Sequence, residues 1–240
     1  MGKRRLPAGT VDFHTHILGG VDHGSQTLAT SVAQWRLMQA SGLSAVVATP
    51  HFYAHEEASV EAYLARRDDA ARALFREVRG ESDMRLYLGT EVLVCPGLEE
   101  LPDLEKLTVA GTDIILLEMP LGGWSHLHLR TVSRIASRGL TPLLAHLNRY
   151  SLHSLDMLYD NPAFLFQLNL SALLGFGAIP RYFRRMLKAG AIAALGSDLH
   201  GTPKDGYDTH VRAFLRAGAA LDIVNEHTAE MLAPATPFAL

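Results

Sequence analysis

The chain has 240 residues, of which 48% are hydrophobic and 20% are charged, and its formal net charge is −3. This length and composition predict one globular domain over residues 1–240, because α/β barrels of this size commonly remain undivided. The interspersed charges exclude bulk binding to nucleic acid, and no apolar run approaches the ~18 residues that membrane insertion requires.

Strand-like and helix-like segments alternate along the whole chain. Short, continuous apolar runs indicate strands covered on both faces, and apolar residues at helical spacing indicate amphipathic helices. After a flexible tail at residues 1–10, we expect strands at 11–17, 43–49, 84–88, 113–117, 141–145, 164–168 and 191–195. We expect helices at 26–41, 58–79, 98–107, 125–138, 151–160, 179–189, 207–217 and 226–233.

This alternation predicts an α/β fold with a parallel sheet, either closed into a barrel or doubly wound. A complete barrel of this type has eight strands. Because the sequence indicates seven, an incomplete or distorted barrel is favoured.

The opening strand contains the motif Asp12-Phe13-His14-Thr15-His16. Alternate side chains of a strand share a face, so Asp12, His14 and His16 are expected to point the same way. Two imidazoles aimed together form half of a metal site. The histidines on predicted helices and loop tips are instead interpreted as surface or packing residues. These are His55, His126, His128, His153, His210 and His227.

Metal-type side chains also follow most of the other predicted strands. In a parallel α/β domain, the loops at the carboxyl ends of the strands build the active site. We therefore expect these side chains to converge with the opening histidine pair. In chain order they are His51, Glu91, Glu118, His146, Asp198 and His200. Asn169 ends the remaining strand and could line the site as a neutral hydrogen-bonding group.

This donor set exceeds the needs of one ion, because zinc takes about four ligands and octahedral ions about six. Several ions are therefore expected. Imidazole-rich coordination favours zinc, manganese or iron over magnesium or calcium, and carboxylates can bridge neighbouring ions. Such a cluster activates water and neutralises a phosphate ester, which predicts hydrolytic chemistry.

Other nucleophiles are disfavoured by the sequence. The single cysteine, Cys95, excludes an internal disulfide and predicts a reducing, cytoplasmic location. A cysteine-based phosphatase needs an arginine six positions later, where this chain has Leu101, and the adjacent Glu99 and Glu100 would raise the pKa of the thiol. Neither the nucleophile elbow Gly-x-Ser-x-Gly nor a P-loop occurs.

These blocks resemble the PHP (polymerase and histidinol phosphatase) superfamily, which opens with Asp-x-His-x-His. They are most similar to its bacterial protein-tyrosine phosphatases of capsule and exopolysaccharide clusters, the CpsB/CapC/YwqE group. The resemblance spans nearly the whole chain. It is carried by the opening motif, Ala48-Thr49-Pro50-His51, Gly89-Thr90-Glu91-Val92, Leu117-Glu118-Met119-Pro120, Thr141-Pro142-Leu143-Leu144-Ala145-His146 with Arg149, and Ser197-Asp198-Leu199-His200.

The resemblance implies a distorted (β/α)7 PHP barrel with a centre of three manganese, zinc or iron ions. It implies that Arg149 grips phosphate oxygens. One ion is expected among His14, His16, Glu91 and Asp198, a second among Glu91, Glu118 and His146, and a third among His51, His200 and a residue of the loop at 21–24.

Three departures from the group concern this centre. The group usually has Asp-Asp-Gly where this chain has Asp22-His23-Gly24, so His23 is the expected loop ligand and Asp22 the alternative. Asn148 replaces the acid that normally precedes the block arginine, and a further arginine expected after the Asp198 block is absent. These changes imply weaker gripping of phosphate or a different substrate.

The main hypothesis is a metal-dependent phosphatase that hydrolyses phosphotyrosine on a protein, such as a bacterial tyrosine kinase. A metal-bound hydroxide would attack phosphorus, and Asp198 or a metal-bound water would protonate the leaving oxygen. The first alternative keeps the fold and metals but acts on a small phosphomonoester such as histidinol phosphate. The second is a non-catalytic, metal-stabilised binding module.

Overall fold

Ten strands run through the part of the chain that the structure, a computed structural model, describes: residues 5–159, 161–204 and 206–240. All of their pairings are parallel. The strands are β1 (Val11–His16), β2 (Ala45–Ala48), β3 (His51–Phe52), β4 (Arg85–Leu88), β5 (Glu91–Leu93), β6 (Ile114–Glu118), β7 (Thr141–Leu144), β8 (Leu165–Asn169), β9 (Ala194–Gly196) and β10 (Leu199–His200).

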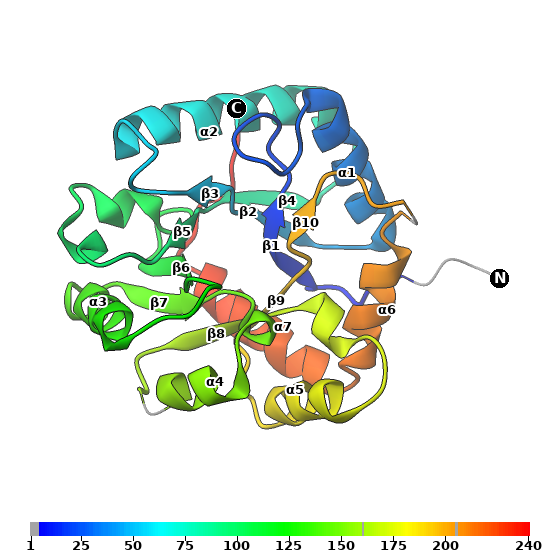
Figure 1. Ribbon diagram of the computed structural model, residues 1–240. Helices are drawn as coiled ribbons and strands as arrows, with labels where there is room; N and C mark the ends of the chain where they lie inside the picture. Colours follow the sequence, from blue (N-terminus) through cyan, green and yellow to red (C-terminus); the bar gives the residue numbers. More distant parts are fainter. Residues whose placement is uncertain (1–4, 160, 205) are drawn as a thin grey trace.

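The strands close into a ring (Figure 1). One sheet has the order β10-β1-β2-β4 and the other the order β3-β5-β6-β7-β8-β9. Three strands change sheet after a break of two residues, because β2 continues into β3, β4 into β5 and β9 into β10. Counting each broken strand once gives seven, so the predicted distorted (β/α)7 barrel is confirmed.

Seven α-helices of the described residues surround this ring or close it (Figure 1). The predicted helix at 98–107 is instead two short 3₁₀ turns, η1 (Leu98–Glu100) and η2 (Leu104–Leu107). The α-helices are α1 (Leu28–Ser41), α2 (Val60–Val78), α3 (His126–Ser137), α4 (Leu152–Tyr159), α5 (Ala178–Lys188), α6 (Asp208–Arg216) and α7 (Ala220–Leu232). None of the helices in the described ranges is long and apolar enough to cross a bilayer.

Helix ends follow local capping chemistry where the sequence supplies it. The side chains of Thr27 and Ser59 accept backbone N–H groups at the starts of α1 and α2, and Gly42 takes the left-handed conformation after α1. α7 begins six residues before the predicted start at 226, and no capping side chain marks its first turn. The missing cap explains why the sequence pattern placed this start too late.

Two apolar clusters hold the barrel together. The larger one lies mainly between strands and helices and includes Trp35 of α1 and Tyr63 of α2. The smaller one joins Phe13 and Val47 of the strands to Leu232 of α7, which crosses behind the ring in Figure 1. Strands β1, β2 and β6 are buried along their whole length, as expected for strands covered on both faces.

Two residues of the predicted flexible tail, Leu6 and Thr10, are anchored to the barrel. Leu6 is buried and its N–H donates to the Ser41 carbonyl, and Thr10 is fully buried with its hydroxyl donating to Pro7. Residues 1–4 of that tail lie outside the described residues. The segment before β1 is therefore held against the end of α1.

The close approach of β9 to β1 depends on Gly196. A Cβ atom at this position would lie 2.4 Å from the Cβ of His14 and 2.9 Å from Nε2 of Gln167. Both neighbours are buried and cannot move away without disturbing the strand ends. A glycine here lets the last strands close the ring beside the opening histidine motif.

We expect Gly196→Ala to lower the free energy of unfolding by about 1–3 kcal/mol, because the added methyl overpacks a filled site. Gly122→Ala is the matched control, since a Cβ at Gly122 meets nothing within 4 Å and its backbone is not left-handed. Urea denaturation of both variants measures the difference. Equal stability of the two variants would contradict the close packing of β9 on β1.

Candidate metal centre

All of the predicted metal-type residues meet at the carboxyl ends of the strands. His14 and His16 end β1, His51 and Glu91 begin the short continuations β3 and β5, and Glu118 ends β6. His146 follows β7, and Asp198 with His200 lies at the junction of β9 and β10. Apart from that of His146, which contacts Glu91 and Glu118, their donor atoms form three adjoining groups, described in turn below.

The first group consists of His14, His16, Glu91 and Asp198. The Nε2 atoms of the two histidines lie 3.3 Å apart, and Glu91 Oε2 lies 3.2 Å from His14 Nε2 and 3.3 Å from His16 Nε2. Asp198 Oδ1 completes the group at 3.7 Å and 3.3 Å from the same nitrogens. Ligands about 2.1 Å from a tetrahedral ion lie about 3.4 Å from one another. The spacing therefore fits a single cation between these atoms.

Glu91 connects this first group to a second one. Its Oε1 lies 2.8 Å from Nε2 of His146, which is also 3.2 Å from Glu118 Oε1. Its Oε2 lies 3.0 Å from Nδ1 of His51, which in turn is 3.9 Å from Glu118 Oε2. The two oxygens of one buried carboxylate thus face different sets of nitrogens, which is the arrangement of a bridging ligand.

The third group is built from imidazoles. Ligand atoms of His16, His51 and His200 lie within 4.8 Å of one another. The ring of His23 stacks on those of His51 and His200, with centroids 4.7 Å and 4.8 Å apart. The loop after β1 therefore brings His23 to the edge of this group.

Asp22 has a different position from His23. Its Oδ2 accepts hydrogen bonds from His16 Nδ1 at 2.6 Å and from the His51 N–H at 2.9 Å, and its Oδ1 accepts the Gly24 N–H. Burial alone would raise the pKa of Asp22, but the hydrogen bond and charge of His16, together with the backbone N–H groups of His51 and Gly24, outweigh burial and lower the pKa well below its ordinary value. Both oxygens of Asp22 thus accept hydrogen bonds from neighbouring groups.

Hydrogen bonds behind the imidazoles decide which nitrogen faces the centre. Gln167 Oε1 accepts the His146 N–H at 2.6 Å and lies 3.2 Å from His14 Nδ1. With cations bound, His14 and His16 would therefore keep their protons on Nδ1, toward Gln167 and Asp22, and direct the lone pairs of Nε2 inward. His200 Nδ1 likewise lies 3.0 Å from the Asp198 carbonyl oxygen. No motif in the sequence predicts this role of Gln167, because the residue lies inside a buried strand.

Asp12 does not join the donor groups, although we expected it to share the face of His14 and His16. The pairing of β1 with β2 shifts register between Asp12 and Thr15. Asp12 Oδ1 accepts the Ser197 N–H at 2.8 Å, and Oδ2 accepts the hydroxyl of fully buried Tyr207 at 2.5 Å. This carboxylate thereby holds the segment that carries Asp198 against β1.

Arg149 lies at the rim of the centre. Its Nη2 donates to Asp198 Oδ2, which also accepts Nδ2 of Asn169 at 2.8 Å, and its side chain is 36% exposed. Asn148, which replaces the group's usual acid, accepts the Asn169 N–H through Oδ1 at 3.1 Å. A guanidinium that is partly open to solvent beside the centre can meet a bound anion.

Two residues of the centre have left-handed backbones without being glycine. His146 has φ 36° and Asp198 has φ 53°. Side chains rarely adopt this region, and such strain concentrates at functional sites. Here the conformation turns each residue sharply out of its strand, toward the donor groups.

Several polar atoms of the centre are buried without a hydrogen bond to a described residue, and they indicate whether its residues suit bound cations. His51 Nδ1, Glu91 Oε2, His146 Nδ1 and Asp198 Oδ1 are buried without a well-formed hydrogen bond among the described residues. Unpaired buried acceptors are costly, and nitrogen and oxygen donors of this kind suit zinc, manganese or iron. Three of these four atoms belong to the donor groups above, so the residues fit metal ions.

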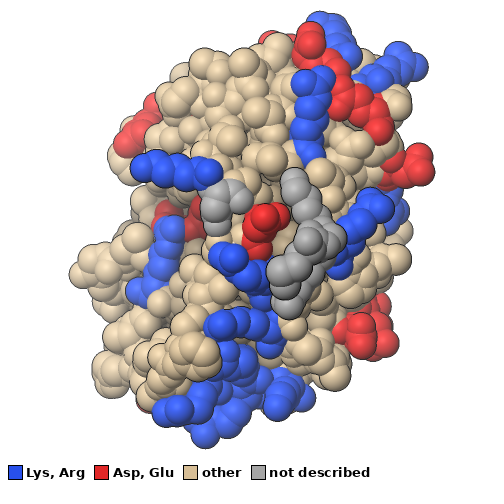
Figure 2. Space-filling view, turned by 90° about the vertical axis from the view of Figure 1, so that its right-hand side faces the viewer, with Lys and Arg blue, Asp and Glu red and all other residues tan. Residues whose placement is uncertain are grey.

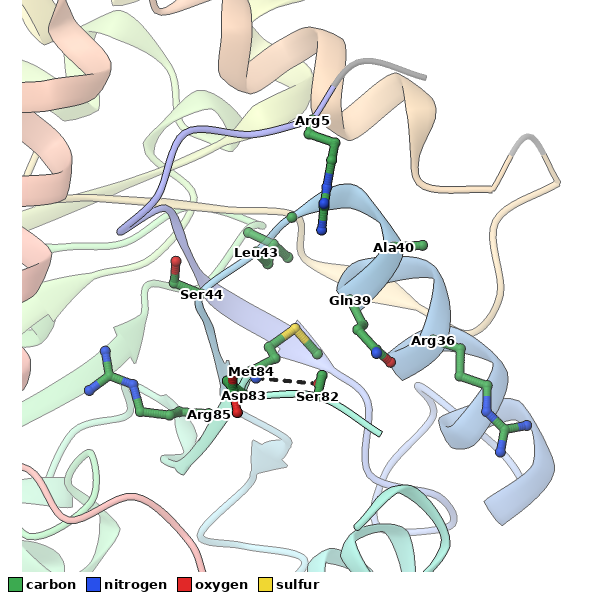
Figure 3. Close-up of a pocket in the computed structure, with 11 residues that line it drawn as sticks. Arg5, Arg36, Gln39, Ala40, Leu43, Ser44, Ser82, Asp83, Met84 and Arg85 are labelled. Carbon is green, nitrogen blue, oxygen red and sulfur yellow. Dashed lines mark hydrogen bonds between the residues drawn. The ribbon is translucent and has the colours of Figure 1, made fainter. Parts of the chain in front are cut away.

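A hollow of about 700 Å³ lies at the other end of the strands, between the end of α1 and the start of β4 (Figure 3). It is lined by arginines, including Arg5 and Arg36, together with Ser44, Asp83 and Arg85. Arg36 is already paired with Glu81. The hollow contains no imidazole among its described lining residues, so it does not extend the centre.

We expect Tyr207→Phe to lower the free energy of unfolding by about 1–3 kcal/mol, because it leaves a buried Asp12 oxygen without its hydrogen bond. Tyr87→Phe is the control, since the Tyr87 ring is equally buried but its hydroxyl makes no hydrogen bond to a described residue. Urea denaturation of the metal-free proteins measures both. A loss in Tyr207→Phe no larger than in Tyr87→Phe would contradict the role of this bond.

Comparison with known proteins agrees with the geometry. Tyrosine-protein phosphatase YwqE from Bacillus subtilis (strain 168) is 24% identical over 232 residues, which cover 92% of this chain and 86% of YwqE. Tyrosine-protein phosphatase CpsB from Streptococcus pneumoniae is 29% identical over 147 residues, which cover 58% of this chain and 57% of CpsB.

The fold has a solved counterpart, described as YwqE from Bacillus subtilis and CpsB from Streptococcus pneumoniae, unique metal-dependent tyrosine phosphatases. It superposes with a TM-score of 0.73 at 21% identity and covers 95% of this chain and 96% of its own. The sequence model of the family described as capsular polysaccharide synthesis, CpsB/CapC, matches residues 10–206. Since that match covers most of the chain, the protein belongs to the CpsB/CapC family.

Proposed function

We propose that this protein is a metal-dependent phosphatase that hydrolyses phosphotyrosine on proteins. The observation that carries the proposal is the convergence of Nε2 of His14, Nε2 of His16, Glu91 Oε2 and Asp198 Oδ1 at the spacing of a metal coordination sphere. The names of the relatives, which are tyrosine-protein phosphatases, support the choice of substrate. The chain would act as one domain, because its donors come from strands throughout the barrel.

The proposed cofactor is a cluster of three manganese, zinc or iron ions. The three donor groups share Glu91, His16 and His51, so the ions would lie side by side. His146 joins the second group through its contacts with Glu91 and Glu118. His23 would complete the third group, and Asp22 would orient His16 rather than bind an ion.

Bound ions of this kind supply Lewis acidity and a nucleophilic water at neutral pH. The residues of the chain position the ester and neutralise its charge. Arg149 offers a planar pair of donors to two phosphate oxygens. The Asn169 side chain lies beside it, because both groups donate to Oδ2 of Asp198.

Asp198 holds Arg149 in place rather than supplying a proton. Burial would raise its pKa, but the charge of His14 and a hydrogen bond from His16 outweigh burial and lower it well below its ordinary value. A carboxyl group with so low a pKa is ionised at neutral pH and has no proton to donate. We therefore assign protonation of the leaving oxygen to water.

Cysteine chemistry is disfavoured by the surroundings of Cys95. Burial raises the pKa of this thiol, and the nearby Glu99 carboxylate raises it further. The thiol is thus protonated at neutral pH and a poor nucleophile.

The proposed physiological substrate is the phosphorylated tail of a bacterial tyrosine kinase that acts in capsule or exopolysaccharide synthesis. Support comes from the family description, which names capsular polysaccharide synthesis. The cytoplasmic location inferred from the single cysteine stays a prediction.

Turnover of a phosphotyrosyl peptide and of histidinol phosphate tests the proposal. The purified protein is reconstituted with manganese, zinc or iron, and phosphate release is measured for both substrates. We expect a higher kcat/KM for the peptide. A clear preference for histidinol phosphate would assign the same centre to a small phosphomonoester, and no turnover of either substrate by metal-loaded protein would favour a binding module.

We expect His14→Ala to lower phosphatase activity more than about a hundredfold and to reduce the bound metal, with the fold retained. His126→Ala is the matched control. His126 belongs to the other His-x-His sequence of the chain, but it is exposed on α3 and is a member of none of the donor groups. Metal content by mass spectrometry and the circular dichroism spectrum separate loss of the ions from loss of the fold.

Metal affinity is expected to increase with pH between about pH 6 and about pH 8. Burial would lower the pKa of His146, but hydrogen bonds to Glu118 and Glu91 raise it to about 9 in the metal-free protein. At neutral pH this imidazole is therefore protonated, and a cation must displace its proton. Affinity should increase by about tenfold per pH unit for each proton displaced.

Isothermal titration of the metal-free protein with zinc measures this dependence. Titrations in buffers of different ionisation enthalpy count the protons that are released. An affinity that stays constant or decreases over this range would show that His146 is not a ligand.

A further inference from the structure

Helix α5 presents a basic stripe to solvent. Arg181, Arg185 and Lys188 are exposed and spaced four and three residues apart, which places them on one face. The helix contains no acidic residue, and these three side chains form no ion pair with a described carboxylate. Lysine and arginine side chains gather in the lower part of the face shown in Figure 2, at the level of α5 in Figure 1.

Exposed apolar side chains lie at the amino-terminal end of this stripe. Phe176 is 91% exposed and Ile179 is 49% exposed. Arg216 lies over the Phe176 ring, 5.3 Å from its centroid, and its Nη1 donates to the Gly175 carbonyl. Arg184 holds the same segment through the Leu173 carbonyl. The loop is thus held by two arginines in a position that leaves Phe176 in water.

This loop lies at the same end of the barrel as the candidate centre. It follows β8 and the short turn η4 (Leu170–Leu173). β8 ends at Asn169, whose side chain donates to Asp198, and Asp198 in turn binds Arg149. A substrate peptide that places one of its residues at Arg149 can therefore continue across the loop between η4 and α5 toward the basic stripe.

Unpaired positive charges on one face repel one another and attract an anionic partner. A fully exposed phenylalanine beside them gives the partner an apolar anchor. A peptide that carries phosphotyrosine is anionic, and acidic neighbours increase its charge. The exposed phenylalanine, the positive charge of the stripe and its position at the end of the barrel that carries the centre therefore fit an acidic phosphotyrosine peptide.

We propose that Phe176, Ile179, Arg181, Arg185 and Lys188 form a docking surface for acidic residues that flank the phosphotyrosine of the substrate. We call it the α5 surface. The inference rests on the proposed function and deepens it, because it states which phosphotyrosine proteins the centre prefers. Contacts on the α5 surface lower KM without taking part in the reaction.

The test compares phosphotyrosyl peptides whose flanking residues are aspartates, serines or lysines. The metal-loaded wild-type protein is measured beside Arg181→Glu/Arg185→Glu. The matched control is Arg76→Glu/Arg79→Glu, which reverses two exposed charges at the end of α2, on the opposite side of the barrel in Figure 1. p-Nitrophenyl phosphate, which has no flanking residues, reports the basal activity of each protein.

We expect wild-type protein to hydrolyse the aspartate peptide with the lowest KM. The α5 variant should raise that KM about three- to tenfold, favour the lysine peptide and keep its activity on p-nitrophenyl phosphate. The α2 control should resemble the wild type. Added salt should reduce the preference of the wild type, because exposed charges are screened.

Equal KM values of the wild type for the three peptides, or an unchanged preference in the α5 variant, would overturn the α5 surface and leave the proposed function intact. Hydrolysis of p-nitrophenyl phosphate without turnover of any peptide would overturn the proposed function itself. Binding of the wild type, but not of the α5 variant, to phosphatidylglycerol vesicles, with the peptide preference unchanged, would assign the surface to lipid and overturn the proposal.

Discussion

The structure depends on a cluster of opposite charges buried at one end of a barrel. Glu91 and Asp198 face His14 and His16 across distances of 3.2–3.7 Å, in surroundings from which water is excluded. Isolated carboxylates could not remain ionised at such a site, because burial of a charge is costly unless a partner compensates it. The pKa of Glu91 is nevertheless far below its ordinary value, since its interactions with His14, His146 and His16 together outweigh burial.

Side chains from the outer helices fix the strand ends that carry this cluster. The Tyr63 hydroxyl of α2 donates to the Pro50 carbonyl, directly before His51, and Arg67, one helical turn later, donates to the Gly89 carbonyl, shortly before Glu91. Both contacts lie at breaks where a strand changes sheet. The breaks that distort the barrel are therefore also the places where donors turn inward, which links the irregular fold to its chemistry.

The sequence was sufficient to predict the seven strands and the convergence of the metal-type side chains at their ends, because parallel strands bring their carboxyl ends together whatever their separation along the chain. It was not sufficient for the groups that orient those donors. Gln167 contacts His14 across 153 positions, and Tyr207 contacts Asp12 across 195. Such contacts depend on how β8 and α6 pack against the rest of the barrel, and the pattern of neighbouring residues in the sequence does not predict that packing. The strand breaks and the uncapped start of α7 were missed for the same reason.

The ring closes through the pairing of β10 with β1, so two segments that are synthesised far apart in time must meet before the ring is complete. The first histidines leave the ribosome early, whereas Asp198 and His200 emerge only after most of the polypeptide has been made. A nascent chain therefore exposes incomplete ligand sets for most of its synthesis. Under the proposed function, cation capture would be a late event in maturation, coupled to arrival of the final strands rather than to formation of the opening motif.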